Sequence, residues 1–338
     1  MKKQNHYVAV SAALGMFVLI FDGSTALNGA REGIMLCLST LIPALYPFIF
    51  LSNLLTGALS GQELGILRPV TKFCKMPAGS ESLLAVGFLG GYPIGAQCVR
   101  LLRMQGQLSD ADAMRALAFC NNAGPSFIFG ILSSMFSDWK APWLLWIVHI
   151  VSALFVGVLI PAASESSHIK LQKQKQTLIQ SFNQALKAMA SICGWVILMR
   201  MVLAFMESRF LWLLPLPMQV AAEGLLELSN GCVRLSELPC EGLRFLIASG
   251  LLSLGGICVM LQTRSVSDGV SLRLYFPGKI IQCAISILIS SLLQVFFPAS
   301  ERYNCSAVAL IALIALVFAE LFLKHSEKNS RIPAGVSV

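Results

Sequence analysis

Long apolar runs joined by short basic loops are the feature that most constrains this chain. Its residues are 56% hydrophobic and only 12% charged, whereas roughly a quarter of the residues in a soluble domain are charged. So few charges cannot cover a surface in contact with water. Because several runs reach the ~20 residues that a helix needs to cross a bilayer, the sequence predicts an all-α polytopic membrane protein.

The net charge of +8 indicates membrane topology rather than a nucleic-acid partner. The basic residues cluster in short loops, as the positive-inside rule expects of cytoplasmic loops. We therefore expect the lipid bilayer as a partner and no nucleic acid. The clusters are Lys2/Lys3, Arg68/Lys72/Lys75, Lys170/Lys173/Lys175, Arg264/Arg273 and Lys324/Lys328.

The apolar runs predict about eight transmembrane helices and two interrupted segments. The basic loops alternate correctly only if each interrupted segment enters and leaves on one side. These segments are then re-entrant hairpins of opposite orientation, with both termini in the cytoplasm. The first run is either a signal peptide or an uncleaved span, and the length of its apolar stretch favours the span. The expected spans are 7–27, 33–55, 113–135, 143–160, 186–206, 243–261, 280–297 and 307–323, and the hairpins are 82–104 and 211–235.

Hairpins of opposite orientation indicate an inverted repeat, as in many secondary transporters. The stretch GAQCVRL at 95–101 resembles SNGCVRL at 229–235, which supports the repeat. We expect a first transmembrane helix at 1–30, a first repeat at 31–163, a cytoplasmic linker at 164–181, a second, inverted repeat at 182–298, and a last helix with a short basic tail at 299–338.

Helix breaks inside the apolar segments predict a ligand site. At ~1.5 Å per residue, the breaks lie near the middle of a hydrocarbon core about 30 Å thick. Freed backbone is tolerated there only when it is buried in protein or lines a wet cavity, so the half-helix ends would offer N–H and C=O groups to a solute or ion. The candidate binding residues are Gly90, Gly91, Tyr92, Pro93, Gly95, Gln97, Asn121, Asn122, Gly124, Pro125, Ser126, Glu223, Glu227, Asn230, Gly231, Gly255 and Gly256.

The glycines and asparagines also have a purely structural interpretation. Gly87, Gly91 and Gly95 are spaced by four, which on an unbroken helix makes a packing stripe. Packing and ligand approach remain open for them with equal weight. The pair Asn121-Asn122 can instead join helices, although the Gly-Pro that follows at once favours a cavity.

The charged residues near the breaks leave alternatives open as well. Glu223 and Glu227 are either ligands of a cation or proton or residues on the outer, wet face of the hairpin. Arg115 is expected to extend to the cytoplasmic interface. His149 is expected to be an interior histidine with its hydrogen bonds satisfied.

Catalysis and metal binding are not indicated by any motif. The chain contains no GxSxG, HExxH, GxxxxGK[ST] or GxGxxG. Its ten cysteines show neither a CxxC nor a ligand-like spacing with histidine. We expect no enzyme activity, no cofactor and no metal.

Four stretches resemble the sporulation integral membrane protein YlbJ family: PALYPF at 43–48, GGYPIGA at 90–96, RALAFCNNAGPSF at 115–127 and ELSNG at 227–231. Gly255-Gly256 with Gln262, and also Gln282, are similar to late positions of that family, which adds Gln262 to the candidate residues. The resemblance places the chain in the nucleoside-recognition or Gate domain group. It implies inverted repeats and a link to endospore formation.

The leading hypothesis is a transporter-like protein of the cell membrane that is involved in endospore formation. It would hold or move a small polar solute, nucleoside-like, or a coupling cation between the two hairpins. The alternative is a non-transporting structural or assembly protein of the spore envelope, cortex or coat, with spore-envelope proteins as its partners. Homo-oligomers remain open in both cases.

Overall fold

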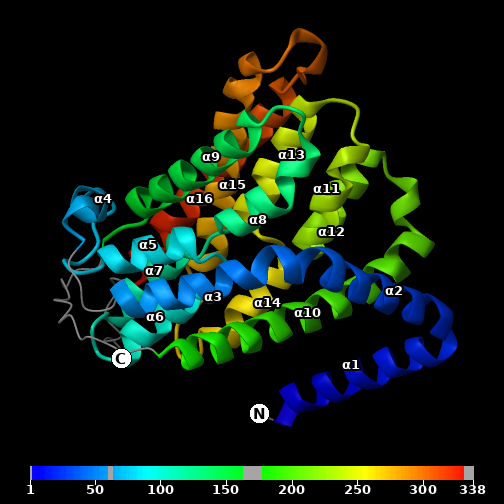
Figure 1. The fold of residues 1–338 in the computed structure, drawn as a ribbon, viewed down its shortest axis with the longest axis horizontal. Coiled ribbons are helices and arrows are strands. Elements are labelled where there is room, and N and C mark those ends of the chain that lie inside the picture. Colours follow the sequence, from blue (N-terminus) through cyan, green and yellow to red (C-terminus); the bar gives the residue numbers. More distant parts are fainter. Residues whose placement is uncertain (1, 60–63, 163–176, 331–338) are drawn as a thin grey trace, which may run out of the picture.

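The chain is a bundle of helices in the computed structural model, which describes residues 2–59, 64–162 and 177–330 (Figure 1). No strand occurs within those residues. Six helices or helix pairs are long and apolar enough to cross a membrane, which confirms an all-α polytopic membrane protein. They are Gly23–Leu59, Lys140–Leu159, Leu178–Arg209, Glu241–Val266, Tyr275–Phe296 and Ser306–Leu323.

The first two helices divide at a different place from the one expected. Helix α1 (Lys2–Phe21) ends before Asp22, whose carboxylate accepts a hydrogen bond from the backbone N–H of Thr25 at 3.3 Å and caps α2 (Gly23–Leu36). The expected boundary between 27 and 33 is therefore wrong. An acidic residue inside an apolar run ends a helix here because its side chain satisfies the free N–H groups of the next one.

The run from α2 into α3 (Ile42–Leu59) is continuous. A short π-helix, Cys37–Leu41, joins the two. Pro43 follows directly and has no N–H to donate, which favours such a local widening of the helix. The expected second span is thus part of a longer helix.

Two sets of six helices follow one another in the same order: a span, a hairpin of two short helices, a broken span and a full span. The first set is α3, α5 (Glu81–Leu89), α6 (Ile94–Met104), α7 (Asp110–Cys120), α8 (Pro125–Gly130) and α9 (Lys140–Leu159). The second set is α10 (Leu178–Arg209), α11 (Leu216–Leu226), α12 (Leu228–Val233), α13 (Glu241–Leu254), α14 (Gly256–Val266) and α15 (Tyr275–Leu292).

The contacts between helices repeat in the same pattern. In the first set α5 contacts α6, α6 contacts α7 and α7 contacts α9; the equivalent helices of the second set make the equivalent contacts. The sets also interlock, since α15 packs on α7 and α9 packs on α13. Figure 1 shows the hairpins α5–α6 and α11–α12 on opposite sides of the centre of the bundle. The two sets of helices therefore match in order and in contacts, and their inverted orientation in the membrane stays a prediction.

The remaining elements flank these two sets. Helix α4 (Arg68–Phe73) precedes the first hairpin, and α16 (Ser306–Ser330) packs on α15. Most of the expected linker 164–181 and the end of the tail lie outside the described residues; α10 begins at Leu178. Short 3-10 helices lie at Gly65–Leu67, Leu132–Met135, Leu211–Leu213, Arg234–Glu237, Leu293–Phe296 and Ala299–Glu301.

Local sequence explains where several helices begin. Ser109 caps α7 by accepting from the N–H of Asp112 at 3.1 Å, and Asp110 and Asp112 lie in the first turn. Both acids therefore lie where the helix dipole favours negative charge. Thr177 and Gln180 form a capping box at α10, and Pro125 begins α8, where no N–H is needed.

Arg115 corrects an expectation, because it is buried rather than extended to the interface. Its side chain on α7 is 1% exposed. The guanidinium donates to the carbonyls of Lys75 at 2.8 Å and Gly157 at 2.6 Å, and also to those of Cys74 and Ile160. These carbonyls end α4 and α9, where the helix dipole carries negative charge. Arg115 therefore holds two helix ends against α7.

Replacing Arg115 by alanine is expected to lower the free energy of unfolding by at least about 3 kcal/mol, because several buried carbonyls lose their donor at once. Thermal unfolding in detergent measures this. The control is Arg103→Ala, whose side chain is paired with Asp110 at 2.6 Å on the surface and should change stability by less than about 1 kcal/mol. Equal effects of the two substitutions would contradict the role of Arg115.

Candidate functional site

The helix breaks of each repeat meet in the interior of the bundle. In the first repeat, a Cβ on Gly91 would lie 2.9 Å from the backbone nitrogen of Gly124. In the second, a Cβ on Gly256 would lie 3.0 Å from the carbonyl oxygen of Leu225. Each broken span therefore touches the break of its own hairpin at backbone distance. Only glycine permits such an approach.

Tyr92 joins the two repeats. It follows Gly91 in the first hairpin, and its hydroxyl donates to the carbonyl of Leu252 at the end of α13, at 3.1 Å. A Cβ on Gly255 would lie 3.1 Å from the same hydroxyl. The peptide bond between Tyr92 and Pro93 is cis. All four breaks are thus linked.

Packing accounts for two of the three spaced glycines. A Cβ on Gly87 or on Gly95 would lie 2.2 Å or 2.3 Å from the carbonyl oxygen of Cys120, so both arms of the hairpin rest on the end of α7. Gly91 has a φ of +75° and lies in the break itself. The three residues therefore do not form the stripe of an unbroken helix.

The asparagine pair is fully buried and joins elements of both repeats. The Oδ1 of Asn121 accepts from the N–H of Ala96 at 3.3 Å, and its Nδ2 donates to Thr263 at 2.8 Å. The Nδ2 of Asn122 donates to the carbonyl of Phe119 at 2.6 Å. The helix-joining interpretation thus describes these contacts.

Lys279 is the main functional candidate that sequence reasoning missed. It lies on α15, is 1% exposed, and points at the end of α7. Its Nζ donates to the backbone oxygen of Asn121 at 2.6 Å, to Oδ1 of Asn122 at 3.1 Å and to Oε1 of Gln282 at 2.9 Å. The rings of Tyr92 and Tyr275 lie 5.5 Å and 5.7 Å from it.

A signal for Lys279 was present in the sequence. The expected span began at residue 280, so this lysine lay just outside it and was not considered. The helix in fact begins at Tyr275, so Lys279 lies one turn inside it. Gln282 follows three residues later on the same face. A lysine and an amide at that spacing, directly after Phe-Pro-Gly, mark a polar face at the start of an apolar helix.

His149 is an interior histidine with its hydrogen bonds made, as expected. Its Nε2 accepts from the N–H of Ala123 at 3.1 Å, beside the break between α7 and α8. Its Nδ1 lies 3.5 Å from Oγ of Ser253 and from Nε2 of Gln282. The ring therefore links the first break to both α13 and α15.

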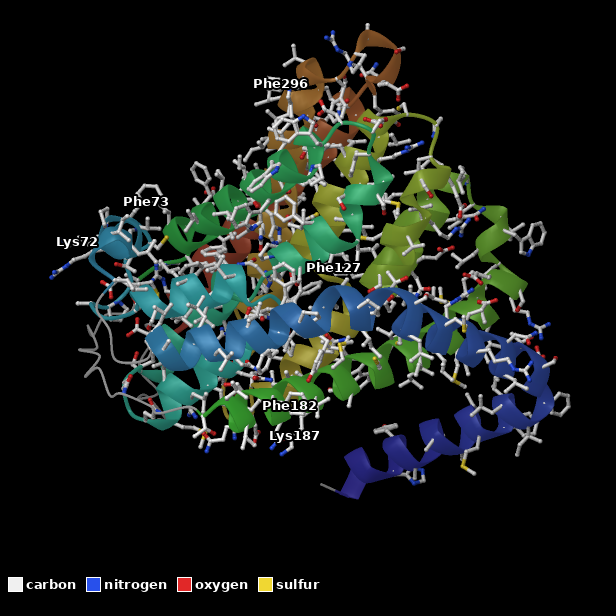
Figure 2. The ribbon with its side chains drawn as sticks, viewed as in Figure 1. Lys72, Phe73, Phe127, Phe182, Lys187 and Phe296 are labelled. Carbon is white, nitrogen blue, oxygen red and sulfur yellow. The ribbon has the colours of Figure 1, made fainter. Side chains whose placement is uncertain are left out.

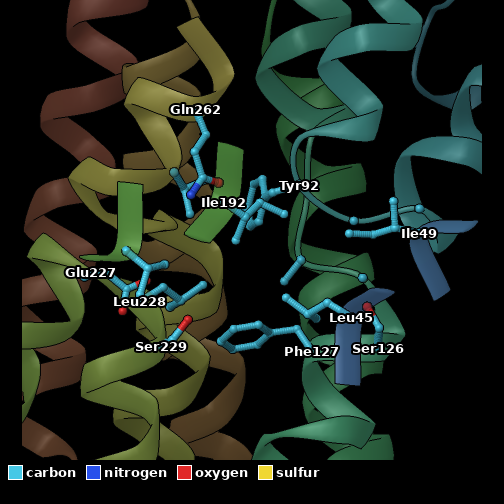
Figure 3. Close-up of a pocket in the computed structure, with 16 residues that line it drawn as sticks. Leu45, Ile49, Tyr92, Ser126, Phe127, Ile192, Glu227, Leu228, Ser229 and Gln262 are labelled. Carbon is cyan, nitrogen blue, oxygen red and sulfur yellow. The ribbon is translucent and has the colours of Figure 1, made fainter. Parts of the chain in front are cut away.

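A cavity of about 50 Å³ lies between the repeats (Figure 3). In the close-up, Glu227, Leu228, Ser229 and Gln262 approach it from one side, and Tyr92, Ser126 and Phe127 from the other. It contains the polar side chains of Tyr92, Ser126, Glu227, Ser229 and Gln262 among apolar ones. Of the predicted residues, Gly90, Gly91, Tyr92, Gly124, Ser126, Glu227 and Gln262 line it.

Glu227 is the acid of this cavity. It is 2% exposed, so the wet-face interpretation is wrong for it. It ends α11 and caps α12, since its carboxylate accepts from the backbone N–H and from Nδ2 of Asn230, both at 2.8 Å. The break between the two helices thus places a carboxylate beside the cavity.

Glu223 lies apart from the cavity lining. It is 1% exposed and forms an ion pair with Arg234, so the wet-face interpretation is wrong for this acid too. Arg234 also pairs with Glu237 at 2.8 Å, and this hydrogen bond lowers the pKa of Glu237. Glu223 therefore belongs to an ionic cluster near the end of the second hairpin.

The other predicted residues support the breaks without lining the cavity. Gly231 packs on Gly224, because a Cβ on Gly231 would lie 2.4 Å from the Cα of Gly224. Gln97 is half-buried on α6. Asn121 and Asn122 lie behind the cavity with Lys279. The supporting residues are Pro93, Gly95, Pro125, Asn230, Gly231, Gly255 and Gly256.

Comparison with known proteins gives one relative to report. The chain is 28% identical over 177 residues to the sporulation integral membrane protein YlbJ of Bacillus subtilis (strain 168), a match that covers 51% of this chain and 43% of that protein. The matched region is thus less than half of the relative's length. No family profile matches the chain, and no solved structure matches it.

Gly91→Ala tests the close approach of the two breaks in the first repeat. A positive φ alone disfavours alanine by about 1–2 kcal/mol, and the contact with Gly124 should add about 1–3 kcal/mol. The matched control is Gly106→Ala, because Gly106 has a φ of +69° with nothing within 4 Å of the added Cβ. Unfolding in detergent should show the larger loss for Gly91, and equal losses would argue against the approach.

Proposed function

The chain belongs to the family of sporulation integral membrane protein YlbJ, and from this premise we propose that it acts in endospore formation as a transporter-like protein. It holds a small polar solute or a cation between its two repeats and moves it across the membrane. The role in sporulation is supported by the similarity to the sporulation protein of Bacillus subtilis. Movement of a ligand is supported by the repeated broken helices.

The single observation that carries the proposal is the cavity at the meeting point of the breaks. Residues of both hairpins line it, and it contains one buried carboxylate, Glu227. An ionisable group at this depth in a membrane protein is a functional candidate. Ser126, Ser229 and Gln262 add neutral oxygens that suit a cation or a small polar molecule.

The size of the cavity favours a small ligand. About 50 Å³ holds a few water molecules, each of which needs roughly 10–15 Å³ by this measure. Pockets for larger organic ligands have volumes of about 300–1,000 Å³. A cation or a very small solute therefore fits the present arrangement. A nucleoside would require the repeats to move apart, as rocking of one repeat against the other allows.

Uptake into liposomes tests the proposal. Purified protein is reconstituted, and entry of sodium, potassium and a panel of labelled small solutes, nucleosides included, is followed. Glu227→Gln removes the charge but keeps the size and the acceptor for Asn230. It should reduce the rate at least about tenfold, which corresponds to ~1.4 kcal/mol.

The control for uptake is Glu237→Gln, an exposed carboxylate at the end of the second hairpin, whose rate should stay within about twofold of the parent. Transport through the cavity would be refuted if none of these ligands entered the liposomes. It would also be refuted if Glu227→Gln and the parent gave equal uptake rates. The structural or assembly role in the spore envelope would then be the better proposal.

The proposed orientation places the α4 side in the cytoplasm and the end of the second hairpin outside. Lys72 and Glu237 are both exposed, and the side chain of Lys72 points away from the helices in Figure 2. A cysteine at 237 should react in intact cells with an impermeant maleimide, and a cysteine at 72 only after lysis. The parent, whose ten cysteines are buried or half-buried, gives the background. The reverse pattern would overturn the orientation.

A further inference from the structure

Lys279 places a positive charge in the interior of the bundle. The described ion pairs do not include it, and its three hydrogen bonds go to neutral oxygens, those of Asn121, Asn122 and Gln282. An ammonium has three N–H donors, so each donor has an acceptor. Buried charges in proteins are normally paired with an opposite charge. This ammonium is held instead by dipoles.

The oxygens around the ammonium have the character of a cation site. The backbone oxygen of Asn121 is at the C-terminal end of α7, where unpaired carbonyls carry partial negative charge. Such half-helix ends and unwound carbonyls coordinate alkali cations in membrane transporters. The side-chain oxygens of Asn122 and Gln282 complete the set. The faces of Tyr92 and Tyr275 add attraction for a cation.

The titratable groups around Lys279 do not offer it a carboxylate. Tyr92 and Tyr275 present their rings to it, and Nδ1 of His149 lies 3.5 Å from Nε2 of Gln282. Glu227, the acid of the cavity, accepts hydrogen bonds from Asn230. Within the described part of the chain, the ammonium is therefore the only charge for which hydrogen bonds to Asn121, Asn122 and Gln282 are recorded.

We propose that Lys279 is a tethered cation: its ammonium occupies a monovalent-cation site made by the backbone oxygen of Asn121, Oδ1 of Asn122 and Oε1 of Gln282. The covalent ammonium makes a free ion unnecessary at this site. When the side chain is removed, the three oxygens remain aimed at one point and bind a small monovalent cation from solution. This inference does not depend on transport, because it concerns how the break between α7 and α8 is stabilised in the folded protein.

The test is the salt dependence of unfolding in detergent. Purified parent and Lys279→Ala are heated in choline chloride, then in the same total concentration of sodium, potassium or ammonium chloride. Choline is too large for the vacated space, whereas ammonium has the head-group geometry of lysine. In Lys279→Ala, at least one small cation should raise the melting temperature by about 3 °C for each tenfold increase in concentration. The parent should show the same melting temperature in all four salts.

Two further variants control for general salt effects and for lost packing. Lys187→Ala removes an exposed lysine of α10, which is labelled in Figure 2, and should respond to salts like the parent. Lys279→Met fills the space without a charge, so it should be destabilised by the same amount in every salt.

Several outcomes overturn the inference. If small cations raised the melting temperature of the parent protein, the site would bind a free ion even with Lys279 in place. A Lys279→Ala protein that is equally stable in choline and in all small cations, or that is unfolded in every salt, would show that the oxygens do not form a cation site. A small-cation response in Lys279→Met equal to that of Lys279→Ala would place the ion elsewhere.

Discussion

The fold depends on satisfying the backbone that its helix breaks set free inside the membrane. A broken helix leaves N–H and C=O groups without partners, and lipid offers none. Here side chains from other helices supply them. The ammonium of Lys279 donates a hydrogen bond to the carbonyl of Asn121. The side-chain oxygen of Asn121 accepts from the N–H of Ala96, and the His149 ring accepts from the N–H of Ala123. Each partner comes from a different helix, so satisfying the breaks also fixes the helices relative to one another.

Sequence patterns identified the breaks but not the groups that complete them. Gly-Pro pairs and glycine pairs change the backbone locally, so their positions and their order in the two halves were predictable. Arg115 was assigned to the interface because a basic residue near the end of an apolar run usually lies there, and Lys279 was not singled out. Their true partners are backbone carbonyls of helices distant in sequence, which no local pattern reveals. Asp22 was missed for the opposite reason, because a local cap outweighed the apolar run around it.

Tyr92 divides the predicted site into two parts of different character. On one side its ring lies 5.5 Å from the ammonium of Lys279, within a network where the recorded donors and acceptors are paired. On the other side it borders the cavity that contains Glu227. The two charges are thus kept apart, because Tyr92 is anchored to Leu252 through its hydroxyl. The cavity is lined by the carboxylate and the neutral oxygens, whereas Lys279 is not among its lining residues.

The two repeats solve the same structural problem by different means. At the end of α7 the chain carries Asn121-Asn122, and at the equivalent end of α13 it carries Gly255-Gly256. The asparagines use amide side chains to bind the neighbouring helices and Lys279. The glycines adopt φ values of +79° and +74° and bring bare backbone against the second hairpin. Two sets of helices in the same order therefore do not require a symmetric site. The break after α7 is stabilised by hydrogen bonds between the Lys279 ammonium and neutral oxygens, and the break after α13 by close backbone packing. Glu227 of the second hairpin is the acid that lines the cavity between them.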